Sequence, residues 1–219
     1  MKKLIALLSV AAIMLSFTAC FGNKNETNTP DPSSPSAQAT NEDSNKKVAR
    51  GTISGDVYTN EFAGITFTKT ADWNFLSDDE IASTINAGQA DLDLNVIEEA
   101  LAKKASIYDM AAMSTMGQSV MTVYENTMLT AFKKLTADEY IDALKTQLSN
   151  VSGISYTIGD VTDATLGSTQ FKKLTVKAVT NDVELIQVYY TRAVGAYIVG
   201  VVVTAFSDSE ITEIEAMFS

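Results

Sequence analysis

From Thr52 onward the chain alternates between runs of strand-forming residues and runs with a helical repeat of apolar side chains. The first two short strands should form a hairpin around Thr59-Asn60-Glu61. The last three should form an antiparallel meander with turns at Asn181-Asp182 and Val194-Gly195. The predicted strands, in chain order, are 55–58, 64–67, 119–125, 154–158, 171–180, 183–192 and 196–206.

Three capping-box sequences mark helix starts near residues 78, 137 and 208. Each places Ser or Thr three residues before Glu, at the head of an apolar-periodic run. Asn95-Val96-Ile97-Glu98 is a weaker fourth, near residue 96. The predicted helices 137–149 and 208–218 each carry one apolar face and should lie on a flat surface.

The predicted strand 196–206 shows almost no polar alternation. A strand that is apolar on both faces is covered on both faces. The pattern therefore predicts an α+β fold, an antiparallel β-sheet of about six strands with helices on both faces.

The first twenty residues have the pattern of an export signal. Lys2 and Lys3 precede a run of fourteen uncharged, mostly apolar residues (4–17), and Thr18 and Ala19 precede Cys20. A run of this length is short for a membrane span, which needs about 20 apolar residues.

Phe17-Thr18-Ala19-Cys20 resembles the bacterial lipobox, with Phe17 where that family usually has Leu. The resemblance implies that Cys20 receives a diacylglyceryl group, that the leader is cut before it, and that the new N-terminus can be acylated with a chain such as palmitate. Two or more chains make a durable anchor, whereas one anchors only marginally. The alternatives are an uncleaved N-terminal helix or a secreted protein with a free thiol.

The polar composition of residues 20–51 predicts a disordered linker. All three prolines, Pro30, Pro32 and Pro35, fall in it, and about 30 flexible residues reach roughly 30 Å. The expected organisation is a signal peptide over 1–19, a lipidated cysteine and linker over 20–51, and one domain over 52–219.

Charge and residue inventory exclude several function classes. The sequence holds 16 basic and 27 acidic residues, a net charge of −11, which becomes −13 once Lys2 and Lys3 leave with the leader. An acidic domain repels phosphate backbones and anionic headgroups, which argues against nucleic acid and peripheral lipid binding. The chain has no His, and lipidation of its single Cys would leave no thiol for catalysis, disulfides or thiolate metal sites.

Short packing motifs spread over residues 52–219 resemble those of PsbP-like bacterial lipoproteins. They are Gly64-Ile65-Thr66-Phe67 before Trp73, Leu166-Gly167 before Phe171-Lys172-Lys173-Leu174, and a short closing helix that ends in Phe218. Thr70-Ala71-Asp72 stands where that family usually has a proline before its Trp. The resemblance implies an α/β/α sandwich, shared with PsbP of photosystem II and a nuclear Ran-release factor, and it assigns no functional residue.

Two metal sites are conceivable. A methionine series could ligate Cu(I) through its thioethers, or could simply fill the core. Asp91-Leu92-Asp93-Leu94-Asn95 imitates the start of a calcium loop, but Val96 and Ala102 stand where such a loop needs Gly and Glu, so the alternative is a polar helix entrance. The methionines are Met110, Met113, Met116, Met121 and Met128.

The remaining candidates are carboxylate pairs and tyrosines. Asp78-Asp79, Glu98-Glu99 and Asp138-Glu139 fall in predicted first turns, where negative charge suits the helix dipole. Tyr189, Tyr190 and Tyr197 could line a pocket or pack the sheet.

The sequence thus predicts a lipid-anchored, extracytoplasmic, non-enzymatic binding or accessory module of the cell envelope, with a protein partner and no cofactor. The alternative is a small-molecule or metal-binding lipoprotein, for example with a Met-rich copper site or as a transporter accessory.

Overall fold

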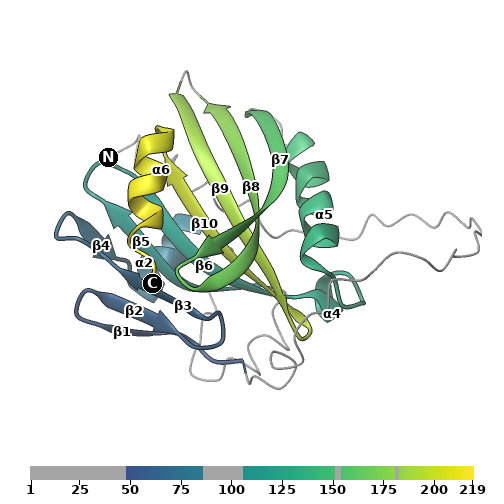
Figure 1. Cartoon of the computed structure of the whole chain (residues 1–219), viewed down its shortest axis with the longest axis horizontal. Helices are drawn as coiled ribbons and strands as arrows, with labels where there is room; N and C mark the ends of the chain where they lie inside the picture. Colours follow the sequence, from purple (N-terminus) through teal and green to yellow (C-terminus); the bar gives the residue numbers. More distant parts are fainter. Residues whose placement is uncertain (1–47, 86–105, 151–153, 181–182) are drawn as a thin grey trace, which may run out of the picture.

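The computed structural model of the chain describes residues 48–85, 106–150, 154–180 and 183–219 (Figure 1). Their elements, in chain order, are β1 (Thr52–Ser54), β2 (Val57–Asn60), β3 (Ile65–Thr68), β4 (Trp73–Phe75), α2 (Asp78–Ile85), β5 (Ser106–Ser114), β6 (Ser119–Asn126), α4 (Thr127–Thr130), α5 (Ala137–Ser149), β7 (Ser155–Leu166), β8 (Thr169–Thr180), β9 (Val183–Val194), β10 (Tyr197–Ala205) and α6 (Asp208–Glu215).

The centre of the fold is a seven-stranded antiparallel sheet in the order β4-β5-β6-β10-β9-β8-β7. The predicted meander β8-β9-β10 lies within it. After β6 the chain passes through α4 and α5 to reach β7 at the far edge, and β10 returns to pair with β6. The predicted α+β class with an antiparallel sheet is confirmed.

Both faces of this sheet are covered, as the apolar run in β10 predicts. Val199, Val201 and Val203 face one core, while Ile198 and Val202 face the other. The first core includes α6 and a separate three-stranded sheet, β1-β2-β3, and the second includes α5 and Ile81 of α2. The hairpin predicted from strands 55–58 and 64–67 is confirmed as β2 and β3, but the sequence does not predict that it forms a separate sheet stacked on one face of the large one.

The helix starts at 78, 137 and 208 are confirmed. Thr136 and Glu139 form a reciprocal capping box at α5, and Ser77 and Glu80 make the same pair of contacts at α2. Ser207 caps α6 by accepting from the Glu210 amide. The fourth predicted start, near residue 96, lies outside the described residues, as do Asp91–Asn95 and Glu98-Glu99.

The packed part begins before Thr52. Val48 is buried in the core, and Arg50 makes ion pairs with Asp78 and Asp109, although both residues fall in the segment predicted as linker. Residues 1–47, with Cys20 and the prolines, lie outside the described residues. No helix among the described residues is long and apolar enough to span a membrane.

Candidate functional site

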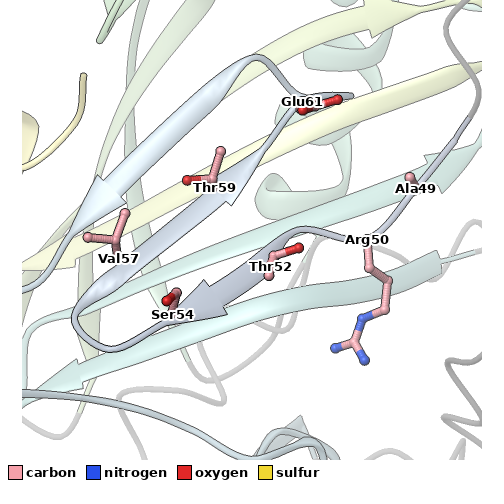
Figure 2. A pocket seen from close by; sticks show the side chains of 7 residues that line it. All are labelled: Ala49, Arg50, Thr52, Ser54, Val57, Thr59 and Glu61. Carbon is pink, nitrogen blue, oxygen red and sulfur yellow. The ribbon is translucent and has the colours of Figure 1, made fainter.

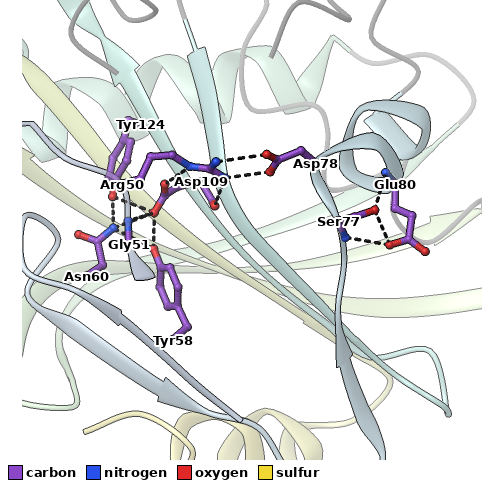
Figure 3. A network of polar contacts seen from close by, with 9 residues as sticks. All are labelled: Arg50, Gly51, Tyr58, Asn60, Ser77, Asp78, Glu80, Asp109 and Tyr124. Atoms are coloured by element: carbon purple, nitrogen blue, oxygen red, sulfur yellow. Dashed lines mark hydrogen bonds and ion pairs between the residues drawn. The ribbon is translucent and has the colours of Figure 1, made fainter. Parts of the chain in front are cut away.

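A buried carboxylate, Asp109, is the centre of a network of polar contacts (Figure 3). It lies at a β-bulge, where the register between β5 and β6 shifts between Tyr108 and Met110. Because a bulge adds one residue, Tyr108 faces the helix layer while Met110 faces the small sheet. The bulge thereby lets Asp109 reach the small sheet.

Both oxygens of Asp109 accept hydrogen bonds from the chain itself. Oδ1 accepts from Arg50 Nε at 3.2 Å. The donors to Oδ2 are the Gly51 amide at 2.8 Å, the Tyr58 hydroxyl at 2.6 Å, Asn60 Nδ2 at 2.8 Å and the Tyr124 hydroxyl at 3.2 Å. The side chain of Asp109 is fully buried, so these donors replace its water shell.

The neighbours of Asp109 are held in turn. Asn60 Oδ1 accepts from the Ala63 amide at 2.7 Å, and the Arg50 guanidinium also binds Asp78 of α2 through both terminal nitrogens. Gly51 must be a glycine here, because a Cβ would lie 2.1 Å from the Tyr58 ring. The cluster therefore joins the entry segment, the small sheet, the large sheet and α2.

Electrostatics fix the protonation of the donors. Burial, together with the neighbouring Asp109, raises the pKa of Tyr58 and of Tyr124 well above the ordinary tyrosine range. Burial alone would lower the pKa of Arg50, but Asp78 and Asp109 outweigh it and raise that pKa. All three side chains thus stay protonated as donors at neutral pH.

A second buried carboxyl, Glu125 of β6, faces the helix layer and has no such partners. Both of its oxygens are buried and lack the close hydrogen bonds that Asp109 accepts, and Oγ of Ser106, directly across on β5, is buried without a hydrogen-bond partner among the described residues. Burial raises the pKa of Glu125 to about 7, although the nearby hydroxyls of Tyr140 and Thr130 offset part of the rise. Glu125 therefore titrates near neutral pH.

The outer face of the β1–β2 hairpin borders an open pocket of about 490 Å³ (Figure 2). Side chains alternate along strands, so Thr52, Ser54 and Thr59 face outward while Tyr58 faces the core. Arg50 lines the rim, but Figure 2 shows its side chain turned away from these hydroxyls. The complete lining is Ala49, Arg50, Thr52, Ser54, Val57, Thr59 and Glu61.

The methionine series does not converge. Met110 lies in the core beneath the small sheet, whereas Met113 and Met121 pack on the helix side. Met116 is 73% exposed at the β5–β6 turn, at the opposite end of β6 from the exposed Met128. The three thioethers of Met110, Met113 and Met116 therefore cannot share one copper ion. No group of three or more His, Cys, Asp or Glu side chains in the described segments is placed to hold a metal.

Of the two alternatives for Tyr189, Tyr190 and Tyr197, the structure shows packing against the sheet and no shared pocket. Tyr189 and Tyr190 are consecutive on β9 and face opposite cores. Tyr190 donates to Glu215 of α6, and Tyr197 packs edge-on against Phe62 at 6.0 Å between ring centroids. The carboxylate pairs at 78–79 and 138–139 stand in first turns as expected, where Asp78 binds Arg50 and Glu139 binds Lys133.

The sequence analysis did not identify Asp109, Arg50 or Asn60 as members of one cluster. Asp109 lies 59 positions from Arg50 and 49 from Asn60 along the chain, so no local pattern connects them. One available signal was a charged residue inside an apolar run, as in Ile107-Tyr108-Asp109-Met110 and Val123-Tyr124-Glu125. An ionisable residue in such a run is buried only when it is paired or its pKa shifts.

The described residues thus define an α+β sandwich domain whose central carboxylate serves internal contacts. Comparison with known proteins finds no matching family model and no matching curated protein.

The solved structures that are similar to this chain include the following two. The solution structure of cyanobacterial PsbP (CyanoP) from Synechocystis sp. PCC 6803 has 8% sequence identity and a TM-score of 0.44, covering 80% of this chain and 95% of that one. The crystal structure of LpqN, involved in cell envelope biogenesis of Mycobacterium tuberculosis, has 14% identity and a TM-score of 0.39, covering 70% of this chain and 76% of that one. Both likenesses concern the fold alone, and neither transfers a functional residue.

Proposed function

We propose that this chain is a non-enzymatic binding module, held on the outer side of a membrane by a lipid on Cys20, and that it contacts a protein of the cell envelope. The observation that carries the non-enzymatic part is the occupancy of Asp109. Its two oxygens accept five hydrogen bonds from the chain's own groups. A general base needs a lone pair that faces its substrate, so a carboxylate bound in this way serves as a structural centre.

The contact surface in this proposal is the outer edge of β1. Ser54 and Val57 close a two-residue turn, so the next pair, Ile53 and Tyr58, is a non-hydrogen-bonded pair of the hairpin. The N–H and C=O of Ile53 therefore point away from β2, and no other described strand pairs with that edge. An extended segment of a partner can add there as a strand, with its side chains over the neighbouring pocket.

Crosslinking in living cells tests this surface. A photoreactive amino acid at Thr52 is expected to capture a specific envelope protein, whereas the same group at Glu213, exposed on α6, should not. The matched variant Ile53→Pro removes an outward N–H that makes no bond to β2, so it should abolish capture from Thr52 while the fold persists.

Identical products from Thr52 and Glu213, or none in any growth condition, would count against a partner at β1. The pocket volume favours the second candidate function, a small-molecule-binding lipoprotein, because ligand sites commonly enclose about 300–1,000 Å³. Blank crosslinking together with a retained small mass in native mass spectrometry of the full chain would select that alternative.

The anchor has its own test. Cys20→Ala is expected to abolish incorporation of a labelled fatty acid, because the thiol is the acceptor of the lipid in the lipobox family that residues 17–20 resemble. Phe17→Leu, which restores the usual lipobox residue, is the matched control and should keep the label. Labelling that survives Cys20→Ala would refute the anchor.

A further inference from the structure

An apolar tip, defined here as Met128, Leu129 and Phe132, projects from α4 and the residue pair that follows it. These side chains are 45%, 41% and 83% exposed. Phe132 has a φ of 56°, in the left-handed region, which is unfavourable for a bulky residue. Phe132 follows the C-cap Ala131 of α4, a position at which helices commonly end in this conformation, and the turn directs its ring into water. An exposed apolar ring contributes little to the stability of the domain itself, so it is available for a contact outside it.

The tip is held firmly. Asn126 caps α4 by accepting from the Met128 amide at 3.1 Å. Thr127 donates twice to the carbonyl of Ala196 in the β9–β10 turn, from its amide at 3.1 Å and its hydroxyl at 2.9 Å. Leu135, three residues beyond Phe132, is buried in the core. The three apolar side chains are therefore presented by a fixed backbone.

The N-terminal side of the chain enters the domain at the same end as the tip. The hydroxyl oxygen of Tyr124, which donates to Asp109, lies 3.4 Å from the carbonyl oxygen of Ala49, and Tyr124 precedes α4 by three residues. Figure 1 shows the start of the blue segment, α4 and the β9–β10 turn at one end of the large sheet. An anchor at Cys20, 28 positions before Val48, would attach the membrane tether to this end of the domain.

Two exposed lysines, Lys133 and Lys134, follow the tip directly. Lys133 pairs with Glu139 at 2.8 Å, so apolar burial rather than net charge must supply most of any membrane affinity. Apolar side chains with lysines at their base suit an interface, because lysine stems extend along apolar surface while their ammonium groups reach water and headgroups.

We propose that Met128, Leu129 and Phe132 form a docking tip that inserts into the interfacial region of the bilayer. The inference rests on the proposed anchoring through Cys20. Three side chains are too few for a stable protein interface, which takes about 800 Å² per partner. They suffice for a tethered domain, because the tether raises the effective concentration of the tip at the surface. Insertion of the tip would restrict the orientation of the tethered domain at the membrane surface.

A tryptophan reporter tests the tip. The chain has one tryptophan, Trp73, which is buried, so Phe132→Trp adds one exposed indole. The full-length variant, isolated from bacterial membranes, is reconstituted in vesicles of phosphatidylcholine and phosphatidylglycerol with brominated acyl chains. We expect its emission to shift to the blue and to be quenched. Met116→Trp, at the other end of β6, is the matched control and should be quenched no more than the unmodified chain.

The Cys20→Ala chain with excess vesicles separates the tip from the anchor. Any apolar leader that stays on this chain is common to both variants, so the difference made by Leu129→Ser reports the tip. We expect this change to lower the affinity roughly tenfold, because burying one leucine contributes about that factor. The Phe132→Trp chain with Cys20 intact is also floated with vesicles at low vesicle concentration, which tests the anchor. Quenching of the added indole without such flotation would support the docking tip and overturn the lipid anchor. Flotation without quenching would support the lipid anchor and overturn the docking tip. If the chain neither floats nor is quenched, both proposals are overturned. A blue shift without quenching by brominated lipid identifies a protein or a second copy as the occupant and overturns the lipid proposal.

Discussion

Replacing Asp109 by Ala is expected to lower the free energy of unfolding by about 3–5 kcal/mol, the usual effect of removing one partner from a buried ion pair. The variant strands the donors of Tyr58, Asn60 and Tyr124 in the core without an acceptor. It also weakens the joint between the small and large sheets. Urea denaturation measures the loss, and amide hydrogen exchange in β2 and β3 should rise more than in β9 and β10.

The matched control for this prediction is Asp160→Ala, which removes an exposed carboxylate from the edge strand β7. A double-mutant cycle with Tyr58→Phe isolates one contact, and we expect a coupling energy of about 1–3 kcal/mol because the two groups are in direct contact. A loss below about 1 kcal/mol, within the range of an ordinary surface change, would contradict the structural role of Asp109.

Replacing Glu125 by Gln is expected to remove a pH dependence of stability. The folded pKa of Glu125 is about 7 against an ordinary value of 4.5, so between these values the folded chain binds more protons than the unfolded chain. Stability from this group is therefore fully present below pH 4.5 and is lost as pH rises through 7. The loss amounts to about 3 kcal/mol over that window. The Gln variant should match the parent near pH 4.5 and exceed it by about this amount at pH 8.

Urea denaturation of both chains at steps across about pH 4.5–8 gives the difference directly, since all other titrating groups are common to both. Glu213→Gln, on the exposed face of α6, reports the effect of removing one carboxylate from the surface. Parallel stability curves for the parent and Glu125→Gln would show that Glu125 is not buried as described.

Local sequence determined the elements with the strongest local signals. The helix predicted over 137–149 has those same bounds, because the capping box at Thr136 and the repeat of Tyr140, Ile141, Leu144 and Leu148 act within one turn or two. The meander of the last three strands followed from short turns and continuous β-branched runs. Weak local patterns failed: β5 carries no alternation to mark it, and β7 extends to Leu166 through a segment rich in Gly, Asp and Thr.

The polar interior escaped sequence reasoning because it has no local rule. Asp109 meets Arg50, Tyr58 and Asn60 only because a bulge in β5 re-aims one side chain and a small sheet lies against the large one. Neither a bulge nor the stacking of two sheets has a sequence period. Likewise, the spacing of Met110, Met113 and Met116 suggested that they could bind one copper ion. The structure rules this out, because Met110 and Met113 face opposite sides of the large sheet and Met116 lies in the β5–β6 turn.

The sequence by itself determined the α+β class, three helix starts, the coverage of β10 on both faces, and the acidic, histidine-free composition. All of these depend on residues near one another or on simple counts. Tertiary structure alone decided that Asp109 connects the two sheets, that Glu125 is buried beneath the helix layer, and that Phe132, just after α4, is exposed. Burial and long-range contact depend on which segments pack together, and no short window of sequence contains that information.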